Sequence, residues 1–511
     1  MKTVEDLLRQ EYFEQFEQLV ADTRPTLDIA NLARVLDVTN GVAQITGFSS
    51  LGADELVTFA DGTLGMASNI GAQRTGVIVL GATDRIFPGD RVTRTGRVAE
   101  TPVGKALLGR VVDPLGRPLD RGMPPRTDEH LPVERPAPPI IHRAPVTTPL
   151  QTGIKAIDAA IPIGRGQREL ILGDRQTGKT SIALGAILNQ RDTGVISIYC
   201  AIGQRASGVA RVIQELRAHG ALERTIVVVA GGQEAPGLQF IAPYAATSMA
   251  EYFMQQGRDT LIVYDDLTRH ARAYRELSLL LRRPPGREAY PGDIFHIHAR
   301  LLERATQLRS DLGGGSLTAL PIIETQARNI SDYIPTNLIS ITDGQIYVSS
   351  RLFDKGQLPA VDIGASVSRV GGRTQLPAYR TVAGDLRLFY AQYEELETFA
   401  RFGTQTDTAT QTTLTRGRRV RAALRQNEFD LLDVPSQIAI LLAATTGVLD
   451  HIPVDQVADA VRRAADAART ACAPILQSIL DGDPLKPLER DRLVQAMTEA
   501  LQTPPHGKDA G

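Results

Sequence analysis

Gly173-Asp174-Arg175-Gln176-Thr177-Gly178-Lys179-Thr180 fits the phosphate-loop pattern GxxxxGK[ST]. An apolar run at 169–172 predicts a strand before it, and residues 181–188 predict the start of a helix after it. In that setting the glycines let backbone N–H groups and the helix N-terminus face an anion. We expect Lys179 to reach the outer phosphates and the Thr180 hydroxyl to ligate Mg²⁺. A plain glycine-rich turn is the alternative, and the flanking strand and helix favour a nucleotide site.

A second apolar run, 260–264, ends in the two carboxylates Asp265 and Asp266. Parallel sheets bind their ligands at the carboxyl ends of strands, so we expect Asp265 to hold Mg²⁺ through its water shell. Two acids after a strand also suit a helix N-cap. The phosphate loop upstream favours the metal role.

The chain has 511 residues, which suggests about three domains. The formal net charge of −2 gives no electrostatic reason to expect nucleic acid as a partner. The two cysteines, Cys200 and Cys472, lie far apart, which favours a reducing compartment and burial as small hydrophobic residues. The apolar run 438–449 is too short to span a bilayer, and no secretory signal is visible at the N-terminus. We therefore expect membrane contact only through partners.

Periodicity divides the chain into four segments. In 1–25, apolar residues at spacings of three and four predict an amphipathic helix, which either packs on its own domain or binds a partner. In 26–95, short runs separated by Asn40-Gly41 and Asp61-Gly62 predict hairpins of an N-terminal β-barrel. The third segment, 96–375, opens with residues 99–150, which are rich in Pro and Gly and predict an irregular connector into the next domain.

Buried-strand runs and helical stretches alternate through the segment 96–375, which is typical of a parallel sheet and makes the chain a multidomain α/β protein. Beyond 376 the alternation stops, and helical periods predict a C-terminal helical bundle over 376–511. The expected strands lie at 170–172, 195–201, 225–230, 260–264 and 339–341, and the expected C-terminal helices at 384–402, 414–425, 435–449 and 454–480.

Several stretches together resemble the alpha subunits of F-type ATP synthases, over nearly the whole chain and in the same domain order. The resemblance implies that the central segment is a RecA-like P-loop NTPase domain that binds ATP and Mg²⁺. It rests on PIGRGQREL at 162–170, GDRQTGKT at 173–180, YDDL at 264–267, LLLRRPPGREAYPGD at 279–293, GSLTALPIIETQ at 315–326, TDGQI at 342–346 and SVSRVG at 366–371.

Gln204 distinguishes this chain from the catalytic beta subunits of the same family, which carry Glu at the corresponding place. Hydrolysis needs a carboxylate there to orient and polarise the attacking water. An amide can hold a water but cannot take its proton. Unless Asp266 substitutes as the base, the site is expected to hold Mg-ATP and turn it over poorly or not at all.

The resemblance also implies that Arg369 reaches across a subunit boundary to the γ-phosphate in a catalytic beta site, with Ser366 and Ser368 setting its loop. Without the resemblance, an Arg beside a Ser-rich turn reads as a surface residue. By the same resemblance, three alpha and three beta chains alternate around a gamma-type shaft, and residues 1–25 dock a peripheral stalk. The complex is then peripheral to the cytoplasmic face of a bacterial inner membrane, touching it only through the ion-translocating sector. The resemblance does not determine whether the coupling ion is a proton or sodium.

Two departures lie near the expected adenine site. Leu358 stands where the family usually carries Arg, and Glu428 replaces an amide, whereas Gln426 is kept as a nucleotide contact. They suggest a divergent, alternate F-type enzyme and leave base specificity open.

Three other interpretations compete. A purely structural subunit with an empty pocket is one of them, and the intact Lys179 and Thr180 argue against it. A beta-like catalytic subunit would need a carboxylate at position 204. A ring-shaped RNA helicase like the Rho terminator would need an aromatic and basic strand platform, and the segment 28–98 offers only scattered Phe48, Phe59 and Phe87.

Overall fold

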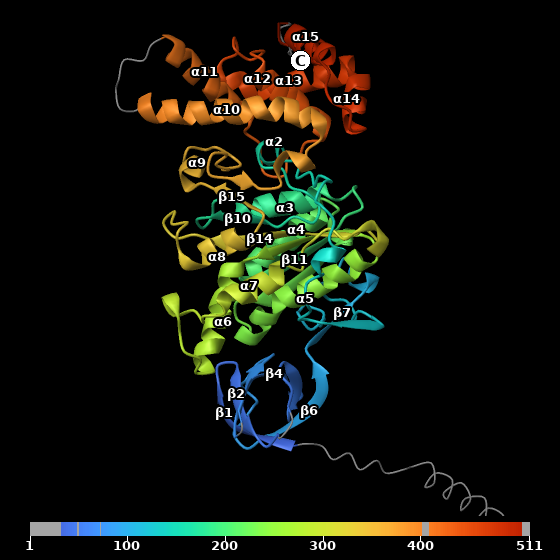
Figure 1. Cartoon of the computed structure of the whole chain (residues 1–511), viewed down its shortest axis with the longest axis vertical. Coiled ribbons are helices and arrows are strands. Elements are labelled where there is room, and N and C mark those ends of the chain that lie inside the picture. The colour runs from blue at the N-terminus through green and yellow to red at the C-terminus, as the bar shows by residue number, and fades with distance from the viewer. Residues whose placement is uncertain (1–31, 49–50, 72, 401–407, 503–511) are drawn as a thin grey trace, which may run out of the picture.

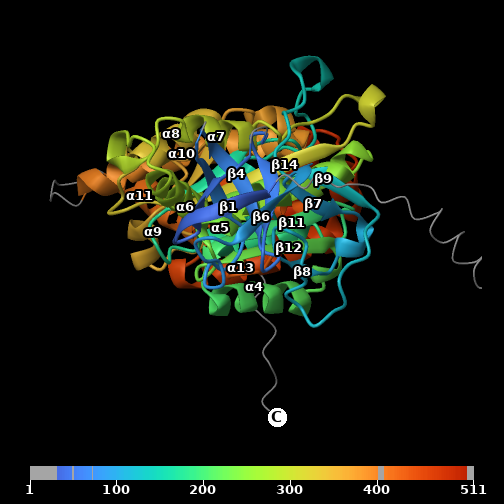
Figure 2. The same cartoon turned by 90° about the horizontal axis from the view of Figure 1, so that it is seen from below.

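The computed structural model describes residues 32–48, 51–71, 73–400 and 408–502. Three parts follow one another along the long axis: a barrel at one end, a sheet domain in the middle and a helical domain at the other end (Figure 1). Seen end-on, the barrel lies within the outline of the middle domain (Figure 2). The predicted helix in 1–25 lies outside the described residues.

The N-terminal part is a closed six-stranded antiparallel barrel, as predicted, in the order β1-β2-β5-β4-β3-β6. Asn40 and Gly41 have φ of 39° and 89°, the left-handed values that a two-residue hairpin between β1 and β2 requires. The strands are β1 Leu32–Thr39, β2 Val42–Thr46, β3 Glu55–Phe59, β4 Leu64–Ile70, β5 Thr75–Val79 and β6 Arg91–Val98.

The middle part is a sheet of eight strands in the order β16-β15-β10-β14-β13-β11-β12-β8, parallel except for the pair β15–β16. This confirms the predicted parallel sheet. Its long strands are almost wholly buried, which is why they read as continuous apolar runs. The strands are β8 Val111–Val112, β10 Glu169–Gly173, β11 Ile196–Gln204, β12 Thr225–Gly231, β13 Asp259–Asp265, β14 Ser316–Glu324, β15 Gly344–Val348 and β16 Val367–Ser368.

Two predictions for this region were wrong. The run 339–341 is not a strand but the last turn of helix α8, Tyr333–Ile341. Its buried residues Ile334, Leu338 and Ile341 recur at spacings of four and three, the helical period, and the true strand is β15. The connector 99–150 is not wholly irregular, because β7 Glu100–Val103 pairs with β9 Glu129–Pro132 and β8 extends the main sheet.

The helices of the middle and C-terminal parts agree with the predicted helical character. The C-terminal segment predicted at 454–480 is interrupted near Cys472, where Pro474 cannot supply a main-chain N–H.

Among the described residues, no helix combines the length and the apolar character that a membrane span needs. The helices are α2 Lys155–Ala160, α3 Lys179–Asn189, α4 Ala206–Ala218, α5 Pro236–Gln255, α6 Leu267–Leu280, α7 Ile294–Leu302, α8, α9 Ser350–Asp354, α10 Pro377–Ala400, α11 Thr408–Ala423, α12 Val434–Thr445, α13 Val457–Ala471, α14 Ala473–Leu480 and α15 Pro487–Gln502.

A pair of buried histidines packs between α5, α6 and α7. His270 and His298 are both 0% exposed, with Nδ1 of the first 3.3 Å from Nε2 of the second, and Nε2 of His270 lies 3.1 Å from the carbonyl oxygen of Phe240. Burial lowers the pKa of His270 to about 4 and that of His298 well below its ordinary value. Both imidazoles are therefore neutral in the fold at pH 7.

We expect acid to destabilise the chain through this pair. Below about pH 6.5 these imidazoles bind protons in the unfolded state but not in the folded state. The free energy of unfolding therefore decreases as the pH falls toward 4. The loss assigned to His270 is about 2–3 kcal/mol between pH 7 and 4.5. Urea unfolding at a series of pH values measures it. A His270→Gln variant should show a shallower decline, and an unchanged slope would contradict this account.

Candidate functional site

The phosphate loop lies between β10, which ends at Gly173, and α3, which begins at Lys179. Gln176 and Gly178 have φ of 59° and 97°, so the chain turns tightly in the left-handed region before the helix. No side chain caps the N-terminus of α3, and its first turn carries no acid. The first-turn N–H groups and the positive end of the helix are therefore available to an anion.

Lys179 is buried, at 7% exposure, and its Nζ donates to the carbonyl oxygen of Gly173 at 2.8 Å and also to that of Asp174. Burial lowers the pKa of this ammonium group, while the nearby carboxylates Glu324, Asp266 and Asp265 counteract the effect. Within the described residues, this buried cation is hydrogen-bonded only to carbonyl oxygens, which suits a phosphate partner.

The other residues of the loop either bind the rest of the chain or line a cavity. Asp174 fastens the loop to the end of β14, since its Oδ1 accepts from the Thr325 hydroxyl at 2.7 Å and from the Arg328 N–H at 3.1 Å. Arg175 is exposed and pairs with Glu324 at 2.9 Å. Thr177 and Gly178, in contrast, line a cavity beside the loop.

Asp265 ends β13, which lies two strands from β10 in the sheet. Its Oδ2 accepts from the Thr180 hydroxyl at 2.9 Å and from the Tyr199 hydroxyl at 2.6 Å, and burial raises its pKa. The carboxylate and the Thr180 hydroxyl are hard oxygen ligands of the kind that Mg²⁺ takes. No cluster of three or more His, Cys, Asp or Glu within the described residues could hold a metal. This donor set therefore fits an ion that keeps waters and nucleotide phosphates as further ligands.

Tyr199 could not be predicted as part of the site, because in the sequence it is only a hydroxyl within an apolar run. Its contact with Asp265 depends on the pairing of β11 with β13, which the sequence does not specify.

Gln204 ends β11, and its Nε2 donates to Oδ1 of Asp265 at 2.8 Å. The neutral amide thus lies directly beside the acid that faces Thr180. Asp266, at 1% exposure, is the N-cap of α6: its Oδ1 accepts from the Arg269 N–H at 2.8 Å and its Oδ2 from Arg269 Nε at 3.1 Å. Burial and the charge of Asp265 raise the pKa of Asp266 to about 7. The two acids therefore have different environments: Asp265 faces Thr180, whereas the carboxylate of Asp266 is already hydrogen-bonded to the first turn of α6.

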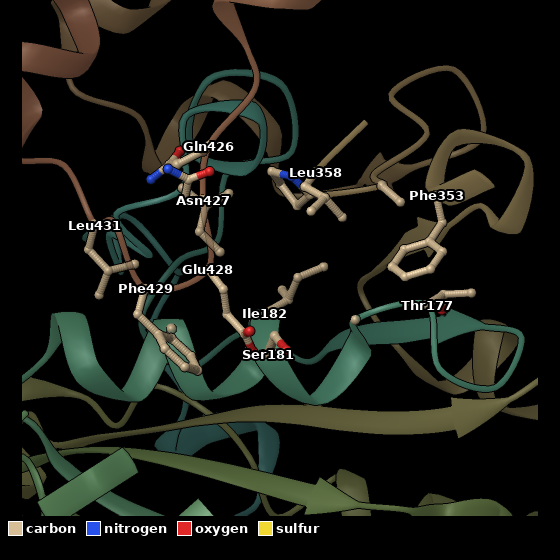
Figure 3. Close-up of a pocket in the computed structure, with 15 residues that line it drawn as sticks. Thr177, Ser181, Ile182, Phe353, Leu358, Gln426, Asn427, Glu428, Phe429 and Leu431 are labelled. Atoms are coloured by element: carbon tan, nitrogen blue, oxygen red, sulfur yellow. Dashed lines mark hydrogen bonds between the residues drawn. The ribbon is translucent and has the colours of Figure 1, made fainter. Parts of the chain in front are cut away.

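A cavity of about 290 Å³ opens beside the phosphate loop. Figure 3 shows Ser181 and Ile182 of α3 on one side, Phe353 and Leu358 on another, and the loop 426–431 opposite. Apolar side chains dominate these walls, as a nucleotide base requires.

Gln426 and Glu428 contribute to this cavity in different ways. The Gln426 amide is fully engaged within the chain: its Oε1 accepts from the Lys155 N–H at 3.0 Å, and its Nε2 donates to the carbonyl oxygens of Gly153 and Asp430 at 2.7 and 2.6 Å. It therefore holds the wall in place. Glu428 faces α3, where its Oε1 accepts from the Ser181 hydroxyl at 2.6 Å.

Arg369 lies away from the phosphate loop of its own chain. The preceding residue, Ser368, pairs with Gly344, which in turn pairs with Glu169 at the start of β10. The phosphate loop lies at the opposite end of β10, at Gly173. Four residue steps along β10 separate these two levels, which is about 13 Å at the usual rise. The exposed guanidinium group donates to two carbonyl oxygens near the end of α8, those of Thr342 at 3.3 Å and Ile339 at 3.2 Å.

Ser366 is 0% exposed, and its hydroxyl bonds within the chain, donating to the carbonyl oxygen of Asp362 at 2.5 Å and accepting from the Tyr347 N–H at 2.9 Å. These contacts suit a residue that shapes the loop and not one that touches a ligand.

Comparisons with known proteins agree with this geometry. Residues 32–96 match the "ATP synthase alpha/beta family, beta-barrel domain", residues 153–368 its "nucleotide-binding domain", and residues 375–500 the "ATP synthase alpha/beta chain, C terminal domain". The "ATP synthase subunit alpha 1" of Chlorobium luteolum is 58% identical over 480 residues, 94% of each chain. The "ATP synthase subunit alpha 2" of Syntrophus aciditrophicus is 56% identical over 493 residues, 96% of this chain and 95% of the relative.

A third relative, "ATP synthase subunit alpha 1" of Shewanella frigidimarina, is 54% identical over 505 residues, 98% of each chain. Matches of this length decide against an RNA helicase, and the relatives are named as alpha and not beta subunits. The chain belongs to the ATP synthase alpha/beta family, as a nucleotide-binding subunit of the alpha type.

Proposed function

We propose that this chain holds Mg-ATP in a site that does not catalyse and supplies Arg369 to the catalytic site of a neighbouring beta subunit. The observation that carries the first part is Gln204, an amide whose Nε2 lies 2.8 Å from Asp265. A general base must accept a proton from the attacking water, and an amide cannot. Two other acids at this end of the sheet are already engaged within the chain, since Asp266 caps α6 and Glu324 pairs with Arg175.

The chain's own residues account for binding without turnover. The loop N–H groups, the N-terminus of α3 and Lys179 attract the phosphates, and the apolar cavity receives the base. Thr180 and Asp265 would hold Mg²⁺, which neutralises phosphate charge when it is bound. The nucleotide is oriented and charge-compensated, but the Gln204 amide takes no proton from water.

Placing Arg369 in the partner's site is supported by its distance from its own phosphate loop and by its exposure. In the proposed complex three alpha and three beta chains alternate around a gamma-type shaft, and residues 1–25 dock the peripheral stalk. The complex is peripheral to the cytoplasmic face of a bacterial inner membrane and contacts the membrane through its ion-translocating sector.

The chain is further proposed to belong to an alternate enzyme kept beside a housekeeping one. Each of the three relatives carries a number in its name, alpha 1 or alpha 2. Leu358 and Glu428, the two departures in sequence, both line the base cavity.

Mass spectrometry of the complex purified through a tag on this chain tests the proposal. We expect equal numbers of alpha and beta chains, a single shaft subunit and ATP with Mg²⁺ retained on this chain. Recovery of the chain without a beta partner, or with RNA in place of nucleotide, would contradict it.

A further inference from the structure

Glu169 is a buried acid that binding and turnover, as described above, do not use. It begins β10, it is 0% exposed, and its Oε1 has no hydrogen-bond partner within the described part of the chain. Its Oε2 accepts from Nε2 of Gln167 at 2.7 Å, and among the residues that the structure describes no Lys or Arg hydrogen-bonds to it. Burial raises the pKa of this carboxyl well above its ordinary value, which favours the neutral acid over the ionised form.

Gln167 joins this acid to the arginine loop, which we define as residues 366–371. The Gln167 side chain is fully buried, its Oε1 accepts from the Gly164 N–H at 2.8 Å, and its Nε2 donates both to Glu169 and to the Ser368 hydroxyl at 3.2 Å. The amide is thereby fixed at three points. One of these points is the residue that immediately precedes Arg369.

The Ser368 hydroxyl links Gln167 to the main chain of the arginine loop. Its hydroxyl donates to the carbonyl oxygen of Pro162 at 2.7 Å and accepts from the Gly371 N–H at 3.2 Å, so it spans the loop on both sides of Arg369. A parallel constraint comes from Asp343, whose carbonyl oxygen accepts the Arg369 N–H at 2.8 Å and whose carboxylate is paired with Arg168.

We propose that Glu169, acting through Gln167 and Ser368, is a positioning residue for Arg369, and that it does so as a neutral acid. The inference rests on the proposed function of Arg369 in the neighbouring site. A neutral acid directs the Gln167 amide without adding charge next to the arginine. The charged groups that face it are Asp343 and Arg369, and an ionised Glu169 would compete with the partner's phosphates for that guanidinium group.

Turnover by the assembled complex, with wild-type beta chains, tests the inference. Gln167→Met keeps the volume but removes the amide, so we expect kcat to fall by about ten- to a hundredfold while KM for ATP stays within about threefold. Ser368→Ala, a smaller change, should lower kcat in the same way and keeps the test open if the first variant does not assemble. Glu169→Gln preserves a neutral oxygen acceptor and should stay within about threefold of wild type, whereas Glu169→Leu should resemble Gln167→Met.

The deciding comparison is made in an Arg369→Ala background. If the three residues act by placing that guanidinium group, Gln167→Met should cause no further loss there, because residues of one unit are not additive. An equal further loss would overturn the inference, as would an inactive Glu169→Gln complex. Failure of the proposed function looks different: Arg369→Ala alone would then leave turnover intact.

Discussion

Replacing Arg369 with alanine is expected to reduce ATP turnover by the assembled complex about 10³- to 10⁵-fold, the range that an arginine finger contributes. The reason is electrostatic: the guanidinium group stabilises charge that develops on the transferred phosphoryl group. Nucleotide binding by this chain should not change, because Arg369 lies at the other end of β10 from the phosphate loop. Steady-state turnover and equilibrium binding of a fluorescent nucleotide measure the two quantities.

The matched control is Arg191→Ala, which removes an exposed arginine whose ionic partner is the adjacent Asp192. Surface pairs of this kind contribute little, so this complex should keep wild-type turnover. Full activity of the Arg369→Ala complex, with correct assembly shown by its mass, would refute the role of that residue.

Replacing Lys179 with methionine is expected to weaken Mg-ATP binding to this chain by about a hundredfold or more. The buried Lys179 ammonium group is expected to pair with the phosphates, and losing one partner of a buried, hydrogen-bonded charge pair costs about 2–5 kcal/mol. Equilibrium dialysis of the isolated chain with labelled ATP measures the affinity.

Lys486→Met is the control for that experiment, because its side chain is exposed on the C-terminal domain and should leave affinity unchanged. A Lys179→Met chain that binds as tightly as wild type would show that the nucleotide is held elsewhere.

Local chemistry made much of the fold predictable. The turn Asn40-Gly41 specifies a hairpin by its own φ preferences, and the buried run before Asp265 specifies a strand whose end must meet the phosphate loop. The run 339–341 failed because three apolar residues fit a strand and a helix end equally well, and only the longer period of α8 distinguishes them. The two-residue strand β8 is too short to carry a periodic signal.

The candidate site was predictable in its motif but not in its distant partners. The tethering of Gln426 by Lys155, across 271 positions, depends on how the C-terminal domain packs on α2. The burial of Glu169 and its contact with Gln167 likewise follow from the pairing of β10 with β15, since a Glu at a strand start is ordinarily solvated. Sequence patterns report local periods, whereas these contacts are set by tertiary packing.

The central claim is that the chain binds ATP without cleaving it, and a single-turnover experiment on the isolated chain tests it most directly. The chain is loaded with labelled Mg-ATP, freed of excess nucleotide, and quenched with acid at intervals. The account predicts that the label is recovered as ATP over many minutes, at the rate of a buffer blank. Release of labelled phosphate at about 1 s⁻¹ or faster, within the ordinary range of enzymes, would contradict it.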